Sequence, residues 1–204
     1  MKENDTEERI LKAAETEFFT KGFDGARTTS IAERAGVTHA MLHYYFRSKA
    51  LLFERVVNDK TNAIRNIIFN VLSDDNTPLL ERIRRGVERH FDIIAENPML
   101  PLFLLNEVAA HPDRSQLLKQ SFGSTAEEIA SGLQTQIDMM ADNGQISRID
   151  ARMLILDIVS LNVFAFISLR MVNTVMPKLT SDIKAYLEMR KKENVEIIMR
   201  RLKP

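Results

Sequence analysis

The sequence of 204 residues contains no cysteine and has only seven glycines and six prolines. The lack of cysteine excludes disulfides, thiolate nucleophiles and cysteine-based zinc sites. Acidic and basic residues balance to a formal net charge of +0, so the chain as a whole lacks the charge excess that indicates a polyanion partner. No alternation of apolar and polar residues is sustained long enough to predict a strand. With 45% hydrophobic and 27% charged residues, we expect a folded, all-α protein.

Motifs of common enzymes are also missing. The sequence has no Gly-x-Ser-x-Gly, no phosphate-binding glycine-rich loop, no dinucleotide fingerprint and no His-Glu-x-x-His. His39 and His43 lie four residues apart, but no nearby aspartate or glutamate completes a tetrahedral metal set. Glu107 and His111 share this spacing and are interpreted as a surface pair or as a satisfied core histidine. We therefore expect no enzymatic activity, no cofactor and no bound metal.

The N-terminus and the most apolar stretch of the chain indicate where in the cell the protein lies. The N-terminus is polar and acidic and has no apolar run of the signal-peptide type, which predicts a cytoplasmic protein. The most apolar stretch, residues 153–169, is interrupted by Asp157 and Asn162. A charge near the middle of a solitary span is costly, so we expect a buried or interface helix there and no membrane partner.

Apolar residues at three- and four-residue spacing predict helices along the whole chain. The first covers residues 6–20 and ends at Gly22. Two short helices follow around a turn at Gly36, with Thr28 or Thr29 capping the first and Thr38 the second. Longer helices are expected over residues 48–72, 79–95, 100–110, 113–142, 150–175 and 180–202. The expected organisation is an N-terminal three-helix domain over residues 1–50 and a larger C-terminal helical domain over residues 51–204.

The two short helices form a candidate helix-turn-helix, in which the second helix enters the major groove. Between Lys21 and Lys60 the net charge is +3, a modest excess that a solvated face alone would also explain. The side chains expected to contact base edges are Thr38, His39, Ala40 and His43. Those expected to contact phosphates are Thr28, Thr29, Tyr44, Tyr45 and Lys49.

About the first 55 residues resemble the tetracycline-repressor (TetR) family of bacterial regulators. The matching elements are the Ile10 to Phe19 pattern, Gly22-Phe23-Asp24-Gly25-Ala26, Ile31-Ala32, Ala35-Gly36-Val37-Thr38, Leu42, the aromatic residues ending at Phe46, and Lys49 followed by Leu52. The resemblance implies an Ω-shaped homodimer bound to successive major grooves of double-stranded operator DNA. It also implies a four-helix dimer interface made by the last two helices, and release from DNA when a small-molecule effector enters the C-terminal core. His43 stands where the family commonly has tyrosine, which leaves its role open.

Two further sets of residues are candidates in the C-terminal part. Aromatic residues and methionines that suit an adaptable pocket are Phe91, Met99, Phe103, Phe122, Met139 and Met171, although most of them are expected to be plain core. The expected dimer interface comprises Asp157, Leu161, Phe164, Ile167, Val195 and Ile198. Asp157 and Asn162 either orient a ligand or fix the register of the dimer, and we favour the second role.

The leading hypothesis is a sequence-specific DNA-binding repressor that a small apolar ligand releases from its operator. Two alternatives come from other classes. One is a helical carrier or enzyme for apolar molecules that has kept an inert helix-turn-helix. The other is an interaction module that binds a partner protein through residues 153–175.

Overall fold

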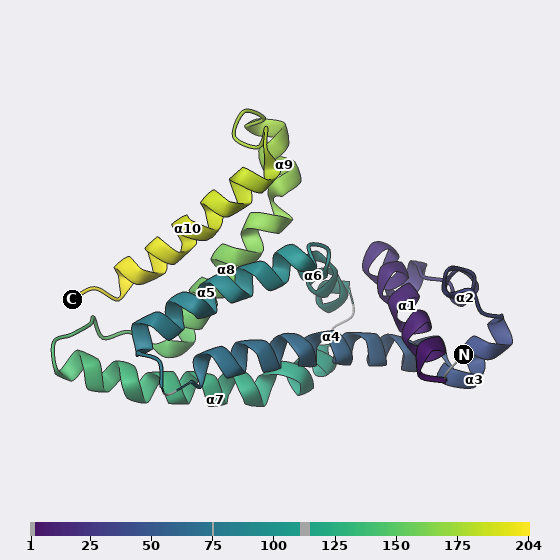
Figure 1. Ribbon diagram of the computed structural model, residues 1–204, viewed down its shortest axis with the longest axis horizontal. Coiled ribbons are helices and arrows are strands. Elements are labelled where there is room, and N and C mark those ends of the chain that lie inside the picture. Colours follow the sequence, from purple (N-terminus) through teal and green to yellow (C-terminus); the bar gives the residue numbers. More distant parts are fainter. Residues whose placement is uncertain (1–2, 75, 111–114) are drawn as a thin grey trace. The chain divides into compact units, whose positions relative to one another are not determined.

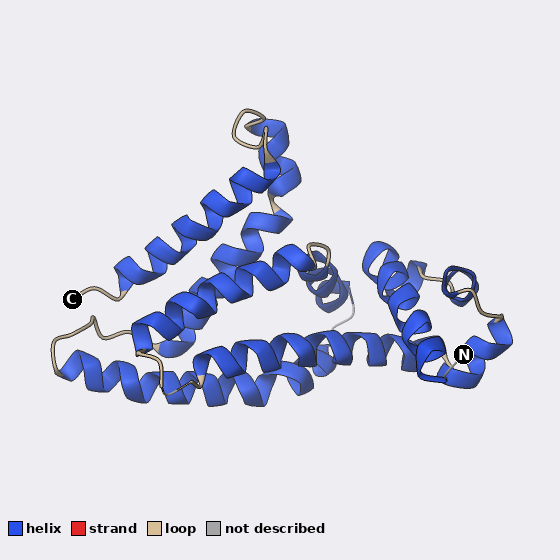
Figure 2. Ribbon diagram, viewed as in Figure 1, coloured by secondary structure: helices blue, strands red, loops and turns tan. Residues whose placement is uncertain are grey.

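The computed structural model describes the backbone of residues 3–74, 76–110 and 115–204, and the side chains of residues 5–74, 76–109 and 126–204. Throughout these ranges the regular structure is helical, with no strand (Figures 1 and 2). In chain order the helices are α1 (Glu3–Gly25), α2 (Thr28–Ala35), α3 (His39–Phe46), α4 (Lys49–Leu72), α5 (Leu79–Glu96), α6 (Leu100–Ala110), α7 (Ser115–Asp142), α8 (Ala151–Ile167), α9 (Leu169–Val175) and α10 (Ile183–Arg201). The expected all-α fold class is confirmed.

The chain divides into two compact units. The N-terminal unit comprises Met1–Ala63 with Leu102–Ser121, and the C-terminal unit comprises Ile64–Pro101 with Phe122–Pro204. The chain passes between the units inside α4 and again near the start of α6. The N-terminal unit is therefore larger than the segment of residues 1–50 in which the sequence places the helix-turn-helix domain.

Helices α2 and α3 have eight residues each, which is too short for a helix that is stable by itself in water. Burial holds them in place. Ile31 of α2 and Leu42 of α3 are fully buried, as are Ile10 and Phe18 of α1. Helix α1 packs on α2, and α2 packs on α3. The short helices thus take their position from α1, in the three-helix arrangement that the sequence predicts.

An aromatic cluster joins α1, α4 and α6 within the N-terminal unit. Phe53 of α4 contacts Phe18 and Phe23 of α1 edge to face, with ring centroids 5.1 and 5.0 Å apart. Phe103 of α6 lies 4.7 Å from Phe19 and 5.9 Å from Phe53 between ring centroids. Such aromatic pairs contribute about 0.5–1.5 kcal/mol each beyond the burial of their area. Helix α6 is therefore fixed to α1 and α4 although it is remote from them in sequence.

Two glycines in the N-terminal unit have a positive φ. Gly36 has φ 65° and ψ 37° and closes α2, because its own N–H and the next N–H bond to carbonyls of the last helical turn. Gly22 has φ 68° and ψ 175°, a conformation that is almost restricted to glycine. The helix is therefore interrupted at Gly22, where the sequence places its end, and a further helical turn continues to Gly25.

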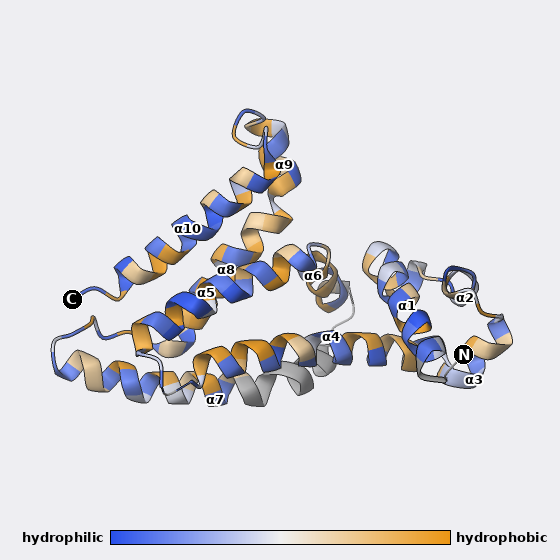
Figure 3. Ribbon diagram, in the orientation of Figure 1, coloured by the Kyte–Doolittle hydropathy of each residue, from blue (hydrophilic) through white to orange (hydrophobic). Residues whose placement is uncertain are grey.

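The core of the C-terminal unit lies among α5, α8 and α10, which pack on one another, with α7 contributing further side chains. Figure 3 shows α8 as mainly hydrophobic and α10 as mixed. The buried members of this core are Leu79, Ile83, Val87, Ala130, Leu133, Ile137, Ile146, Ala151, Leu154, Val195, Ile198 and Leu202.

The single helix expected over residues 150–175 is two helices, α8 and α9, bent by 58°. Ser168 lies at the bend, where its hydroxyl donates to the Phe164 carbonyl at 2.5 Å. A serine that bonds back to the carbonyl four residues earlier bends a helix. No single helix in the described ranges is long and apolar enough to cross a bilayer, although α8 and α9 taken together reach the required length and composition.

A buried polar network connects α5, α8 and α10. The Asn162 side-chain amide, which is 0% exposed, donates to the Val87 carbonyl at 2.9 Å and lies 3.1 Å from Nδ1 of His90. Its oxygen accepts a hydrogen bond from Asn194, also 0% exposed, at 2.9 Å. Asn162 is therefore a polar member of the core of one chain, which corrects its expected place at the dimer interface.

Replacing each of the two positive-φ glycines by alanine should lower the free energy of unfolding by a different amount. Gly36→Ala should lower the free energy of unfolding by about 1–2 kcal/mol, because alanine can enter the left-handed region at that cost. Gly22→Ala should cost more, since its Cβ would also lie 3.3 Å from Oε1 of Glu107. Gly132→Ala, where a Cβ meets nothing within 4 Å, is the matched control and should stabilise α7 slightly. Urea denaturation measures the free energy of unfolding of all three variants. Equal effects at Gly22 and Gly132 would contradict the strained backbone conformation of Gly22.

His90 predicts a pH dependence of stability. Burial lowers the pKa of His90 from 6.5 to about 4. Between these values the unfolded chain binds the proton and the folded chain does not, so the free energy of unfolding falls as the pH falls from about 6.5 toward about 4. Urea denaturation should show a loss of roughly 2 kcal/mol from pH 7 to pH 5. His90→Gln keeps a hydrogen-bond acceptor and cannot titrate, so it should remove most of this loss; an unchanged loss would contradict the role of His90.

Candidate nucleic-acid interface

The turn that leads into α3 ends in a side-chain cap. Thr38 has φ −76° and ψ 155°, and its hydroxyl oxygen accepts a hydrogen bond from the Met41 N–H at 3.2 Å. The predicted cap at Thr38 is confirmed. The predicted cap of α2 at Thr28 or Thr29 is wrong, because α2 begins at Thr28 and the residue before it, Arg27, makes no side-chain cap bond.

One face of α3 is buried and the other is exposed. Leu42 and Phe46 pack inward, with 0% and 7% exposure. All four residues predicted to contact bases are exposed, and they cover the start and outer face of the helix: Thr38, His39, Ala40 and His43. A helix presented in this way fits the major groove, about 12 Å wide, with hydrogen-bonding groups and one small residue toward the base edges.

The two histidines of α3 are held in defined orientations. Their ring centroids are 4.4 Å apart and the rings are almost perpendicular, at 83°. Nε2 of His39 lies 3.0 Å from the Thr28 hydroxyl of α2, and Nδ1 of His43 lies 3.2 Å from the Arg47 carbonyl oxygen. Each ring is thus fixed by a neighbour through one nitrogen. Among the described residues, no group of three or more metal-binding side chains is gathered.

The residues predicted to contact phosphates lie around this helix. Tyr44 is 77% exposed, and Tyr45 is half-buried with its ring 5.5 Å from that of Tyr44. Thr29 is exposed at the start of α2, whereas Thr28 is half-buried and bonded to His39. The hydroxyls of Tyr44 and Thr29 are therefore the most accessible of the four.

Lys49 lies at the first position of α4, directly after a strained turn. Arg47 has φ 21°, and it is the one non-glycine residue of the described chain with a positive φ. The Ser48 hydroxyl accepts a hydrogen bond from the Leu51 N–H at 3.2 Å and so caps α4. A lysine beside a positive helix N-terminus favours a phosphate oxygen. Lys49 Nζ lies 4.7 Å from the centroid of the Phe23 ring and donates to the Asp24 carbonyl at 3.3 Å.

The roles of two carboxylates that organise the N-terminal unit could not be predicted from the sequence. Glu17, 1% exposed, accepts hydrogen bonds from Lys21 at 2.7 Å and from the Arg27 N–H at 3.3 Å. Burial raises the pKa of Glu17, but these bonds and the charge of Lys21 outweigh it, and the pKa lies below its ordinary value. Glu107 of α6 accepts the Phe23 N–H at 2.9 Å. The pairing of Glu107 with His111 that we expect from the sequence stays a prediction, because His111 lies outside the described residues.

Residues 10–56 match the family model described as "Bacterial regulatory proteins, tetR family". This match places the N-terminal helix-turn-helix segment of the chain in the tetR family. The HTH-type transcriptional regulator YdgC of Bacillus subtilis is 29% identical over 142 residues, covering 66% of this chain and 72% of YdgC. The HTH-type transcriptional repressor BdcR of Escherichia coli is 29% identical over 86 residues, covering 41% of this chain and 44% of BdcR. Another match, 24% identical, is named a transcriptional activator.

Likeness to solved structures extends over nearly the whole chain. The crystal structure of HlyIIR, a hemolysin II transcriptional regulator, has a TM-score of 0.67 and 23% identity and covers 98% of each chain. At this identity the likeness concerns the fold. The family match and the relatives together show a DNA-binding transcriptional regulator.

Five of the six residues proposed for the ligand pocket have described side chains, and these five lie in different surroundings. Phe91 packs on Phe166 in the core of the C-terminal unit, with ring centroids 4.9 Å apart. Phe103 belongs to the aromatic cluster of the N-terminal unit. Met99, Met139 and Met171 are exposed, at 44%, 61% and 58%, and the side chain of Phe122 lies outside the described residues. The proposed set is corrected, because aromatic and methionine content does not distinguish core, surface and pocket.

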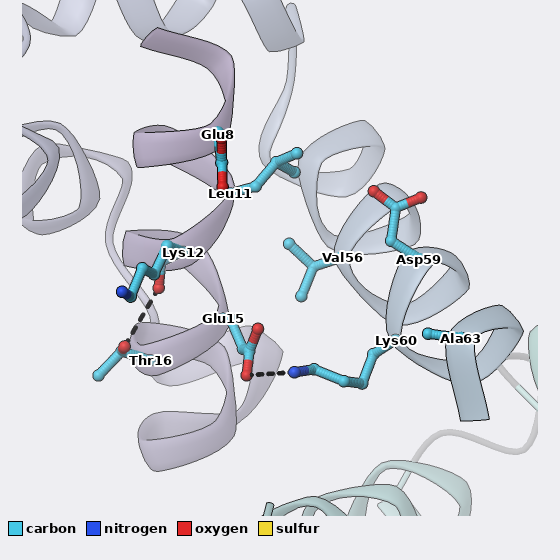
Figure 4. Close-up of a pocket in the computed structure, with 9 residues that line it drawn as sticks. All are labelled: Glu8, Leu11, Lys12, Glu15, Thr16, Val56, Asp59, Lys60 and Ala63. Carbon is cyan, nitrogen blue, oxygen red and sulfur yellow. Dashed lines mark hydrogen bonds and ion pairs between the residues drawn. The ribbon is translucent and has the colours of Figure 1, made fainter. Parts of the chain in front are cut away.

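The described part of the chain has a pocket in each of the two units. One, of about 500 Å³, lies between α1 and α4, where Lys60 bridges to Glu15 at 2.8 Å across an apolar floor that includes Leu11 and Val56 (Figure 4). The other, of about 330 Å³, lies in the C-terminal unit between α4, α5 and α7. Its lining residues are Phe69, Leu72, Ser73, Arg82, Glu128, Ile129, Gly132, Leu133 and Gln136.

The residues proposed for the dimer interface divide into accessible and buried ones. Phe164 is 58% exposed, and Leu161 and Ile167 are half-buried. Asp157 forms an ion pair with Arg201 of the same chain. Val195 and Ile198 are corrected, because they are buried in the core of their own unit and cannot reach a partner. The exposed apolar residues of the two helices are Met153, Leu156, Val159 and Phe164 on α8 and Ile183, Met189 and Ile197 on α10.

Proposed function

We propose that this tetR-family regulator is a cytoplasmic repressor that binds its operator as a homodimer through α3. The exposed face of α3 carries the proposal: two oriented histidines, a small residue and a capped start, backed by buried Leu42 and Phe46. In this reading Thr38, His39, Ala40 and His43 read base edges. The phosphate contacts are made by Thr28, Thr29, Tyr44, Tyr45 and Lys49.

A second copy of the chain is the proposed partner of the exposed apolar residues on α8 and α10. Four large apolar side chains on α8 and three on α10 are more than a third exposed. Exposed large apolar side chains of this kind favour an interaction site, and Met153, Leu156 and Val159 recur every three residues along α8. A two-fold dimer also suits DNA reading, because two recognition helices about 34–36 Å apart meet successive turns of one groove.

The effector site is proposed to be the pocket between α4, α5 and α7. Its volume of about 330 Å³ suits a small molecule, and its lining combines apolar side chains such as Phe69 and Leu133 with the polar Arg82, Glu128 and Gln136. A ligand with both apolar and polar groups fits such a lining. Arg82, 3% exposed, donates to the Leu72 carbonyl at 2.9 Å and to Gln136, and so connects all three helices. Because α4 continues into the N-terminal unit, a ligand that disturbs this connection can change the affinity of the unit for DNA.

Repression is proposed on the strength of BdcR, the relative named a repressor, while the activator among the matches gives the alternative direction. A helical carrier or interaction module with an inert helix-turn-helix is not favoured. Such a protein needs no oriented polar residues on the outer face of α3, and the named relatives are transcriptional regulators.

Variants of His39 and Lys49 test the two kinds of DNA contact. An operator is first selected from a random pool of duplexes, and binding is then measured by fluorescence anisotropy over a salt series. Lys49→Ala should weaken binding to all duplexes alike, by about 3- to 10-fold, and lower the salt slope by about one. His39→Ala should change the preferred base pair at one position of each half-site. Lys178→Ala, at an exposed lysine of the C-terminal unit, is the control and should bind normally.

The base and phosphate roles are exchanged or wrong if Lys49→Ala alters the preference at one base pair while His39→Ala weakens every duplex equally.

Substitution on α8 tests the proposed dimer. Phe164→Glu together with Leu156→Glu places two charges on the exposed apolar face and should convert dimers to monomers in sedimentation equilibrium, with loss of operator binding. Met139→Glu, at an equally exposed apolar residue of α7, should leave the dimer intact. Persistence of the dimer in the double variant would place the interface elsewhere.

A further inference from the structure

A carboxylate of α6 holds the backbone of α1 where that helix is interrupted. Oε1 of Glu107 accepts the Phe23 N–H at 2.9 Å. A Cβ on Gly22 would lie 3.3 Å from the same oxygen, so the carboxylate approaches the chain as closely as a glycine permits. This contact lies within the N-terminal unit, where Phe103 of α6 also packs on Phe19 and Phe53.

Lys49 contacts Phe23, whose N–H Glu107 accepts, and the next residue, Asp24. The Phe23 ring lies 4.7 Å from Lys49 Nζ, and the Asp24 carbonyl accepts a hydrogen bond from the same Nζ at 3.3 Å. Phe23 is in turn packed edge to face on Phe53 of α4. The N–H bonded to Glu107 and the groups that locate the Lys49 ammonium therefore belong to two successive residues, Phe23 and Asp24.

We propose that Glu107 is a positioning residue for DNA binding: by fixing Phe23 and Asp24 it sets the place of the Lys49 ammonium against the operator phosphate. The proposal rests on the proposed function of Lys49 and assigns α6 a part in it. Glu107 does not touch DNA in this account. It acts through Lys49.

The path of the chain makes this contact suitable for regulation. Helix α6 begins in the C-terminal unit and enters the N-terminal unit at Leu102. It lies in sequence between α5 and α7, which both line the pocket proposed for the effector. A displacement of α6 that breaks the bond from Glu107 to Phe23 releases the support of Lys49 and lowers the affinity for DNA.

A double-mutant cycle between Glu107 and Lys49 tests the proposal on the full-length protein. Operator binding and its salt dependence are measured for wild type, Glu107→Ala, Lys49→Ala and the double variant, after thermal unfolding has shown that each is folded. Glu107→Gln keeps an oxygen that accepts from Phe23. Asn106→Ala, at the exposed neighbouring residue of α6, controls for changes in the helix itself.

Glu107→Ala should weaken operator binding about 3- to 10-fold and lower the salt slope by about one, as Lys49→Ala does. The direction is diagnostic, because removal of a negative charge by itself strengthens binding to DNA. The double variant should bind within about twofold of the weaker single variant, since both changes remove one contact. Glu107→Gln and Asn106→Ala should bind within about twofold of wild type.

Two results would overturn the proposal: unchanged or tighter binding by folded Glu107→Ala, or losses that multiply in the double variant. If Glu107→Ala lowers only the melting temperature and leaves the salt slope as it was, Glu107 is a structural residue. Failure of the proposed function is distinguishable, because the wild-type protein would then show no preference for any duplex.

Discussion

The burial of Leu42 and Phe46 is the interaction on which the DNA-reading surface depends. Helix α3 has eight residues, and a helix of this length is not stable in water without support. Burying these two side chains contributes roughly 1.5–3 kcal/mol each. It also turns the opposite face outward, so the same packing that stabilises the helix exposes His39 and His43. The cap at Thr38 then fixes where the helix begins.

Support for this surface comes from helices that are far apart in the sequence. Helix α1 covers α2, the aromatic cluster joins α1 to α4 and α6, and Glu107 bonds to the backbone of Phe23. Helices α4 and α6 both continue into the C-terminal unit. A regulator needs a path of this kind, because an effector changes DNA affinity only by binding two states of the protein unequally.

Local features of the fold could be predicted from the sequence, because short-range chemistry determines them. Gly36 allows the left-handed end of α2, and Thr38 supplies an oxygen to the third N–H of α3. The exposure of the residues proposed to contact bases follows from the spacing of the buried residues within α3. By contrast, Thr28 begins α2 without capping it, because the residue before it takes the capping position.

Features that depend on long-range packing could not be predicted. Val195 and Phe164 are both apolar residues of C-terminal helices, yet one is 4% exposed and the other 58%. Only the packing of α5 against α8 and α10 decides which face is covered. The bond from Phe23 to Glu107 joins residues 84 positions apart, and no periodicity connects them. The bend at Ser168 could not be predicted either. A serine in a helix often bends it when its hydroxyl bonds back to the backbone, and the sequence does not show whether this bond forms.

The most direct test of the account is the specificity of the intact protein for DNA. Its dissociation constants for the duplex selected from a random pool and for a scrambled duplex of the same composition would be measured at one physiological salt concentration. The account predicts a ratio of at least about 10³, as expected of a protein that reads base edges. Equal affinities for the two duplexes, in a protein that is folded and dimeric, would contradict the claim that α3 reads sequence.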